Sequence, residues 1–310
     1  MKKISNCKTI GIVNLGAPEA ANNSDNYNRG LKYLESMGFS LKIASNVLKN
    51  DGFTAGLPEE QVSELHKMYQ DKSVDAILCV GGGTNANELL PLLDFDLIKS
   101  KSKILLGASI VTGILNAIYH YTKCPTFHGP AIIWTFGNED GIGDYTLTSF
   151  KDVLGLPNQH EYSEREDAPD KWQALRYGNS QGVLIGGNLW TLQQLIGTPY
   201  EPDWNNKILV LEDCFSQYAN IKAMLNQFKQ AGIFNKISGL IWGVFLDCED
   251  EYNTGKTLND ILMEVIGDCK FPILANVELG HTSEKLTFPI GSKASLNLSN
   301  DNLKFNVQVE

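Results

Sequence analysis

Apolar and polar positions alternate in blocks along the first third of the chain. Short apolar runs, such as VDAILCV at 74–80, predict strands that are buried on both faces of a sheet. The segments between them carry apolar residues at helical spacing and predict helices. Strand–helix alternation of this kind indicates an α/β fold in which helices cover both faces of a parallel sheet. The predicted strands are 8–16, 40–45, 74–80 and the start of 103–109, and the predicted helices are 26–38, 57–71 and the segment after Ser109.

The last part of the chain shows the same alternation and then changes its period. The final segment, after about residue 285, alternates residue by residue, which predicts antiparallel strands around a turn at 300–302. The strands predicted before it are 182–188, 207–213, 238–245 and 271–277, with helices at 218–232 and 257–267.

A charged segment, SEREDAPDK at 163–171, separates these two parts and predicts a solvated connector. We therefore expect an N-terminal domain over 1–165, a connector over 166–181 and a C-terminal domain over 182–310.

Charge and cysteine content narrow the classes of function. The net charge of −10 disfavours a nucleic-acid polymer as partner, because phosphate binding needs a basic face. The N-terminus lacks the apolar core of a signal peptide, and no apolar run approaches the roughly 20 residues that cross a bilayer. The six cysteines are far apart and form no CxxC pair, which disfavours a zinc site. These features predict a cytoplasmic protein with reduced thiols and no membrane contact.

Ser109 stands where an apolar run ends and a helical pattern begins. One interpretation is a helix N-cap, a position that favours serine. The other is a nucleophile at the carboxyl end of a parallel strand, where ligands collect, with the N–H of Ile110 directed at a developing oxyanion. The surrounding residues, Gly107-Ala108-Ser109-Ile110-Val111, do not form a GxSxG motif, so this pattern leaves both interpretations open.

The glycine-rich segment VGGGTNANE, residues 80–88, also follows a predicted strand. Glycines in such a turn allow close backbone approach and present N–H groups, which suits an anion or oxyanion cradle. A tight turn without a ligand explains the segment equally well. It matches neither the dinucleotide nor the Walker phosphate motif.

A serine nucleophile requires a base and a group that orients the base. Of the five histidines, His281 directly follows a predicted strand, and His128 is a second candidate. The remaining three, His66, His120 and His160, lie in helical or connector segments and are expected to pack or face solvent. Carboxylates at strand ends are Glu212, Asp213 and Glu278, for which a capping or ion-pair role is the alternative. Ser109, Glu212 and His281 are therefore one triad among several that these residues allow.

Several motifs that follow one another along the chain narrow the choice among these triads. The chain contains GGTNANELLPLLDFD at 82–96, IGGNLWTLQQLIGTPY at 185–200, KILVLED at 207–213 and GHTSEKLTFPIG at 280–291. With GFTAGLPEEQ and PTFHGPA, this series resembles the LD-carboxypeptidases, a family of serine peptidases, along nearly the whole chain. The resemblance is strongest to the branch that includes the microcin C immunity peptidase.

The resemblance implies the fold and the catalytic residues. It implies a Rossmann-like parallel-sheet N-terminal domain that carries Ser109 as the nucleophile, and a smaller α/β C-terminal domain. The latter would carry Glu212, from the LED segment, and His281, from the GH segment. Family members are typically cytoplasmic homodimers that need no metal or cofactor. For the oxyanion we expect the N–H groups of Ile110, Gly82 and Gly83.

One departure from the family pattern concerns the nucleophile segment. The family has GYSD where this chain has Gly107-Ala108-Ser109-Ile110, so the tyrosine and aspartate are absent. The departure bears on substrate preference and rate, because an oxyanion N–H needs only backbone. The immunity branch also carries a loop with an aromatic residue that stacks on a nucleoside, and Trp172 either fills that role or packs within the protein.

The sequence thus predicts a serine hydrolase that cleaves an amide near a free C-terminus. Its substrate would be a small peptide or a peptidyl nucleotide of the microcin C type. An alternative substrate is the murein tetrapeptide, from which an L,D-carboxypeptidase removes terminal D-Ala during wall recycling. An alternative of another class is a binding protein with a degenerate site, suggested by the altered serine segment.

Overall fold

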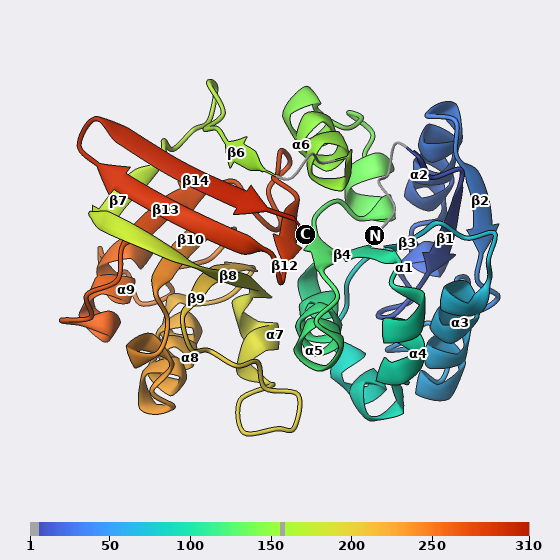
Figure 1. The fold of residues 1–310 in the computed structure, drawn as a ribbon, viewed down its shortest axis with the longest axis horizontal. Coiled ribbons are helices and arrows are strands. Elements are labelled where there is room, and N and C mark those ends of the chain that lie inside the picture. The colour runs from blue at the N-terminus through green and yellow to red at the C-terminus, as the bar shows by residue number, and fades with distance from the viewer. Residues whose placement is uncertain (1–5, 156–158, 310) are drawn as a thin grey trace. The chain divides into compact units, whose positions relative to one another are not determined.

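The computed structural model describes residues 6–155 and 159–309. These fall into two compact units by their internal contacts (Figure 1). Unit 1 is Met1–Leu156 with Ser283–Gly291, and unit 2 is Pro157–Thr282 with Ser292–Glu310. Each unit has its own sheet.

Unit 1 contains a mostly parallel sheet, as the sequence predicts. In its described residues the order is β12-β5-β4-β3-β1-β2, and only β12 runs antiparallel to its neighbour. The central strands are fully buried because helices cover both sides: in Figure 1, α2 and α6 lie on one side and α3, α4 and α5 on the other. The strands are β1 (Thr9–Val13), β2 (Ser40–Ile43), β3 (Ala76–Cys79), β4 (Ile104–Gly107), β5 (Thr126–His128) and β12 (Phe288–Ile290).

The helices of unit 1 follow local signals where these are strong. α3 (Pro58–Gln70) starts with proline and two glutamates, and the Glu60 carboxylate accepts the Leu57 N–H at 3.3 Å. Two helical segments that the apolar pattern did not predict lie beyond residue 130: a π-helix (Ile132–Phe136) and α6 (Asp144–Gly155). The other helices are α1 (Glu19–Asn22), α2 (Ser24–Ser36), α4 (Phe95–Lys101) and α5 (Thr112–Thr122), with a 3₁₀ helix at Ala86–Leu92.

Unit 2 contains a larger mixed sheet. Its described strands run β6-β14-β13-β8-β9-β10-β11-β7, with β8 to β11 parallel and the flanking pairs antiparallel. α7 (Leu189–Gln193), α8 (Tyr218–Gln230) and α9 (Leu258–Ile266) lie on one side of this sheet (Figure 1). The strands are β6 (His160–Tyr162), β7 (Gln173–Arg176), β8 (Gly178–Asn188), β9 (Lys207–Cys214), β10 (Gly239–Leu246), β11 (Ile273–Val277), β13 (Lys293–Ser299) and β14 (Asn302–Gln308).

The units divide the chain differently from the expected domains. The boundary lies at Leu156/Pro157, ahead of the expected one, because β6 already pairs with β14 in the second sheet. The expected connector 166–181 contains β7 and the start of β8, which pair with β11 and β13. The segment Ser283–Gly291 belongs to unit 1, because β12 pairs with β5.

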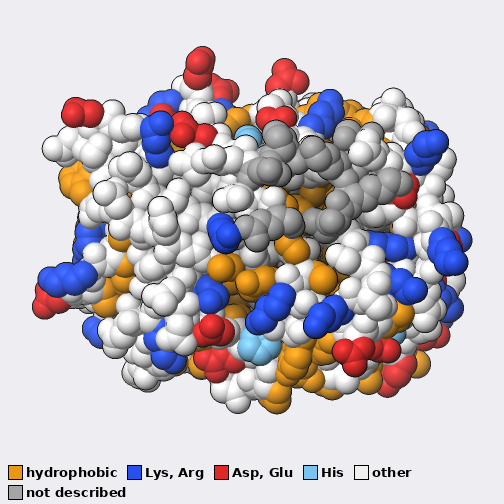
Figure 2. Space-filling view, in the orientation of Figure 1, with side chains coloured by type: hydrophobic (Ala, Val, Ile, Leu, Met, Phe, Trp, Pro, Cys, Tyr) orange, Lys and Arg blue, Asp and Glu red, His pale blue; other side chains and the backbone are white. Residues whose placement is uncertain are grey.

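The surface carries both signs of charge. On the face shown in Figure 2, the Lys and Arg side chains are interspersed with Asp and Glu. No helix in the described residues has the length and apolar character that a membrane crossing requires.

Candidate active site

Glu212 and His281 form a direct pair in unit 2. β9 lies between β8 and β10, and Glu212 sits near its carboxyl end with no exposed surface. The Glu212 Oε2 atom lies 2.7 Å from Nδ1 of His281, which follows β11 in sequence. The His281 side chain keeps 22% of its surface exposed. Glu212 therefore contacts the ring at Nδ1, while part of the ring stays accessible to solvent. The structure thus brings together the two residues predicted to be acid and base.

Two glycines leave room for this carboxylate. Gly280 has a φ of +82°, and a Cβ there would lie 2.0 Å from the Glu212 Oε2. Gly243, on the neighbouring strand, would place a Cβ 3.1 Å from the Cβ of Glu212. Glycine precedes His281 because the turn needs a left-handed backbone and because no side chain fits beside Glu212.

The buried carboxylate determines the charge state of the histidine. Burial alone would lower the pKa of His281, but the Glu212 charge, together with contacts to Cys214 and Glu212, outweighs it and raises the pKa from 6.5 to about 10. The Glu212 carboxylate thus strengthens His281 as a proton acceptor.

A second carboxylate, Asp213, lies beside the pair. Burial, followed by the charge of Glu212, raises the pKa of Asp213 to about 6. Its Oδ1 accepts from Asn188 Nδ2 at 3.0 Å and from the Cys214 N–H at 2.9 Å. Its Oδ2 is buried and has no hydrogen-bond partner among the described residues. Asp213 therefore anchors the end of β9 to the end of β8.

Ser109 occupies a strained turn in unit 1. It follows β4 and opens a 3₁₀ turn, Ser109–Val111, that leads into α5. Its φ of +56° lies in the left-handed region, which is unusual for a residue with a side chain. A sharp, strained strand-to-helix turn is how α/β hydrolases present a nucleophilic serine. Ser109 has this backbone geometry without the GxSxG motif.

The alternative interpretation of Ser109 as a helix N-cap is wrong. The N-cap residue of the 3₁₀ turn is Ala108 and that of α5 is Val111, and neither helix start has a side-chain capping hydrogen bond. The hydroxyl of Ser109 therefore does not cap the helix that follows.

The glycine-rich turn lies directly against Ser109. A Cβ at Gly82 would be 2.9 Å from both Cβ and Oγ of Ser109. The Gly82 N–H, however, donates to Glu19 Oε2 at 3.0 Å. In this structure it is therefore not available to an oxyanion, which differs from the expectation. Gly83 has a φ of +141°, a conformation that favours glycine. Gly83 and Ile110 stay predictions as oxyanion donors.

Three of the other four histidines have packing or hydrogen-bond contacts away from the Glu212–His281 pair. His128 lies in β5, fully buried, with its ring stacked on Phe288 at 4.8 Å. His66 Nε2 accepts the Asp94 N–H at 3.0 Å, and His160 packs edge-to-face on Tyr162. His281 is thus the histidine that the structure pairs with a strand-end carboxylate.

Trp172 packs within unit 2. Its side chain is buried, and its Nε1 donates to Glu278 Oε2 at 3.0 Å. A buried indole is not available to stack on a nucleoside, so the packing interpretation of Trp172 is confirmed. The same bond occupies one oxygen of Glu278, the third strand-end carboxylate.

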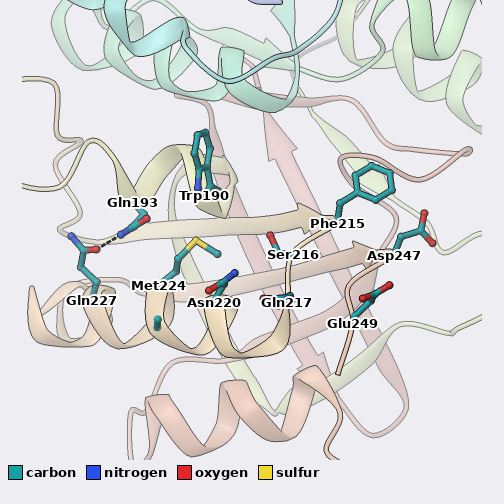
Figure 3. A pocket seen from close by; sticks show the side chains of 11 residues that line it. Trp190, Gln193, Phe215, Ser216, Gln217, Asn220, Met224, Gln227, Asp247 and Glu249 are labelled. Atoms are coloured by element: carbon teal, nitrogen blue, oxygen red, sulfur yellow. Dashed lines mark hydrogen bonds between the residues drawn. The ribbon is translucent and has the colours of Figure 1, made fainter. Parts of the chain in front are cut away.

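Sequence reasoning missed a pocket beside the ends of β8, β9 and β10. It has a volume of about 800 Å³ and lies in unit 2 (Figure 3). Exposed Trp190 and Phe215 contribute aromatic faces, and Asp247 and Glu249 lie with Phe215 at one end of it. Gln193 and Gln227 are hydrogen-bonded to each other at the other end. The rule that ligands collect at strand ends, applied to β8 and β10 as well as β9, would have found it.

Comparison with known proteins decides the family. The model of the LD-carboxypeptidase N-terminal domain matches residues 10–129, and that of the LD-carboxypeptidase C-terminal domain matches 181–296. The chain belongs to the LD-carboxypeptidase family. It is therefore a peptidase.

The described residues contain no group of three or more His, Cys, Asp or Glu side chains that could hold a metal ion.

Relatives in this family include both a murein peptide carboxypeptidase and a microcin self-immunity protein. A putative carboxypeptidase of Vibrio cholerae is 31% identical, covering 98% of this chain and 96% of its own. A probable murein peptide carboxypeptidase of Bacillus subtilis is 30% identical, with 96% and 91% covered. The microcin C7 self-immunity protein MccF of Escherichia coli is also 30% identical, with 97% and 93% covered.

The solved LD-carboxypeptidase structures show the same fold. MccF in complex with aspartyl sulfamoyl adenosine superposes with a TM-score of 0.91 at 28% identity, covering 99% of this chain and 98% of that one. This agreement confirms the predicted fold class, a Rossmann-like parallel-sheet unit with a second α/β unit.

Proposed function

We propose that the protein is a serine carboxypeptidase in which Ser109, His281 and Glu212 act as nucleophile, base and orienting acid. The observation that carries the proposal is the 2.7 Å contact between Glu212 and His281 Nδ1 at the carboxyl end of β9. It fixes one ring nitrogen and leaves Nε2 for proton transfer. The strained turn at Ser109 supports the nucleophile.

The proposed reaction is acyl transfer to Ser109. His281 Nε2 takes the proton from the Ser109 hydroxyl as its oxygen attacks the carbonyl carbon, and Glu212 stabilises the imidazolium. The imidazolium then gives its proton to the leaving amine. Water, activated by the same histidine, hydrolyses the acyl-enzyme.

Backbone N–H groups would stabilise the oxyanion. We assign Ile110 and Gly83 to this role, and Gly82 only if Glu19 releases its N–H. Each such donor contributes about 3 kcal/mol in comparable enzymes. Ala108 and Ile110 replace the tyrosine and aspartate of the family segment without removing a backbone donor.

For the substrate we favour an amide in a peptidyl or aminoacyl nucleotide. The solved relative holds aspartyl sulfamoyl adenosine, and in this chain Trp190 and Phe215 offer exposed aromatic faces to a flat base. The second candidate is the murein tetrapeptide, which the Bacillus subtilis relative favours. No cofactor takes part in either reaction as proposed.

Incubation with each substrate, followed by mass spectrometry, separates the two candidates. The nucleotide proposal predicts cleavage of a peptidyl or aminoacyl nucleotide, with Ser109→Ala as the blank. Release of D-Ala from the tetrapeptide alone would rule it out. No turnover of either substrate would favour the degenerate binding protein.

We further propose that the protein is a cytoplasmic homodimer. All six cysteines of the sequence lie in the described residues as free thiols, which suits a reducing compartment. Light scattering coupled to size exclusion is expected to give twice the chain mass of 34.3 kDa. A mass of one chain across the working concentration range would contradict the dimer.

A further inference from the structure

The pocket of about 800 Å³ in unit 2 has an acidic end that the proposed mechanism does not use. Asp247 and Glu249 lie at this end together with the ring of Phe215 (Figure 3). Among the described residues that line the pocket, these two carboxylates are the charged side chains, and the rest of the lining is neutral. The pocket therefore offers a ligand negative charge at one end and no positive charge.

Backbone hydrogen bonds hold the acidic end in shape. The loops after β9 and β10 lie side by side, because the Phe215 N–H donates to the Leu246 carbonyl at 2.9 Å and the Glu249 N–H to the Ser216 carbonyl at 3.2 Å. These bonds continue the parallel pairing of the two strands. The carboxylates and the ring are thus placed before any ligand arrives, which lowers the entropic cost of binding.

The two pocket carboxylates have no structural partner, unlike their neighbours in sequence. Asp250 accepts a backbone N–H of its own loop at 2.9 Å, and Glu251 accepts two N–H groups at the start of α8 at 3.1 and 3.2 Å. No ion pair or side-chain hydrogen bond within the described residues involves Asp247 or Glu249. These two side chains are therefore available to a ligand.

Nearby lysines neutralise a different carboxylate. Lys222 belongs to α8, which contributes residues to the pocket, and it pairs with Glu264 of α9 at 2.9 Å. Lys256, which precedes α9, pairs with the same Glu264. The negative charge of the acidic end is thus left for a cation from outside the chain.

Two carboxylates beside an aromatic ring suit an ammonium group. Carboxylate oxygens accept charge-assisted hydrogen bonds from its N–H groups, and the face of an aromatic ring attracts its charge. The side chain of Phe215 is 73% exposed, so its ring is accessible to such a group. A phosphate or another anion would be repelled at the same place.

We propose that the acidic end of this pocket binds a primary ammonium group of the substrate, the free amino group of its aminoacyl or peptidyl part. The inference rests on the proposed function, to which it adds a contact for the acyl part of the substrate. Trp190 lies nearer the end formed by Gln193 and Gln227, so its indole stays open to a flat base (Figure 3).

A pair of analogues that differ only in the amine tests the site. Glycyl sulfamoyl adenosine carries a free amino group, and its N-acetyl derivative does not. Calorimetry on wild type should show the free amine bound about tenfold more tightly or better. In the double variant Asp247→Asn/Glu249→Gln the two analogues should bind within about twofold of each other, with the N-acetyl affinity as in wild type.

Two results of this experiment would overturn the site. One is equal affinity for the two analogues in wild type, and the other is an unchanged preference in the double variant. The substitutions keep the size of the side chains, and asparagine tolerates the left-handed φ of +51° at Asp247. The backbone of the acidic end is thus expected to survive them.

Single variants separate the pocket from the overall charge of the protein. Asp268→Asn removes an exposed carboxylate of unit 2 that does not line the pocket, and it should keep the wild-type preference. Phe215→Leu should reduce the preference by about two- to fivefold, because the aromatic face is lost. A loss in Asp268→Asn as large as in the double variant would assign the preference to net charge and refute the site.

The ammonium site and the proposed function fail separately. Turnover by wild type without an amine preference in binding removes the site and leaves the function standing, whereas an amine preference without turnover of any substrate does the reverse. If neither sulfamoyl adenosine binds, the free and the fully N-acetylated murein tetrapeptide are compared on Ser109→Ala. Failure of the free tetrapeptide to bind more tightly would then overturn the site.

Discussion

At the scale of single residues, Gly280 and Gly243 determine whether Glu212 can reach His281. Both lie against the Glu212 side chain, and only Gly280 combines that contact with a left-handed backbone. The pair itself raises the pKa of His281 well above its usual value. Geometry and proton affinity at the site therefore depend on the same few atoms.

Gly280→Ala should reduce kcat/KM by about 100-fold, because a Cβ 2.0 Å from Glu212 Oε2 must displace the carboxylate from the ring. The matched control is Gly255→Ala, whose φ of +71° brings similar backbone strain with no atom within 4 Å. Steady-state kinetics on both variants makes the comparison. Equal losses would mean that backbone strain, not the clash, is responsible.

The pH profile should reflect the charge on His281. The base acts only when neutral, so kcat/KM should rise as pH passes upward through a pKa of about 10. Glu212→Gln removes the charge that raises this pKa, while burial still lowers it, so the midpoint should fall toward or below 6.5. Rates measured from pH 5 to 11 on both proteins test this. An unchanged midpoint in the variant would contradict the assignment of Glu212.

At the scale of elements, the strand-to-helix turn at Ser109 and the glycine turn after β3 form one local structure. Gly82 lies against the serine side chain, and its N–H is bound by Glu19 of α1. The position of the hydroxyl therefore depends on three segments of unit 1.

Gly82→Ala should lower turnover while leaving the free energy of unfolding changed by no more than about 1–3 kcal/mol. The new Cβ would lie 2.9 Å from Ser109 Oγ and push the hydroxyl aside. Gly155→Ala, which meets no atom within 4 Å, is the control. Kinetics with denaturant unfolding separates the two effects. Full turnover in Gly82→Ala would show that the serine position is not critical.

Elements with a strong local pattern could be predicted from the sequence. The buried runs that became β3, β4 and β9 and the capped start of α3 match within a few residues. α6 was missed because its stretch is rich in polar residues. The return of β12 to β5 could not be predicted, because strand pairing between distant segments leaves no local mark.

The candidate site, like the fold, could be predicted from the sequence only in part. Strand-end position alone made Glu212 and His281 candidates among several, and the family motifs selected them. The bond from Gly82 to Glu19, 63 residues away, has no sequence signature, so the engagement of that N–H could not be foreseen. The buried state of Trp172 likewise depends on Glu278, 106 residues on.

At the scale of the whole molecule, the proposed residues come from both units. Ser109 belongs to unit 1, whereas Glu212 and His281 belong to unit 2. The proposed chemistry requires the serine hydroxyl and the imidazole to act on one carbonyl. Under the proposal, removal of the Ser109 side chain from unit 1, or of the His281 side chain from unit 2, should therefore each cause a large loss of turnover.

The most direct test is turnover by Ser109→Ala against wild type, on whichever substrate wild type cleaves. The control is Ser100→Ala, an exposed serine of the same unit. Nucleophile, base and acid working together predict a loss of about 10⁴-fold or more for Ser109→Ala and none for Ser100→Ala. Equal rates for Ser109→Ala and wild type would contradict the covalent mechanism.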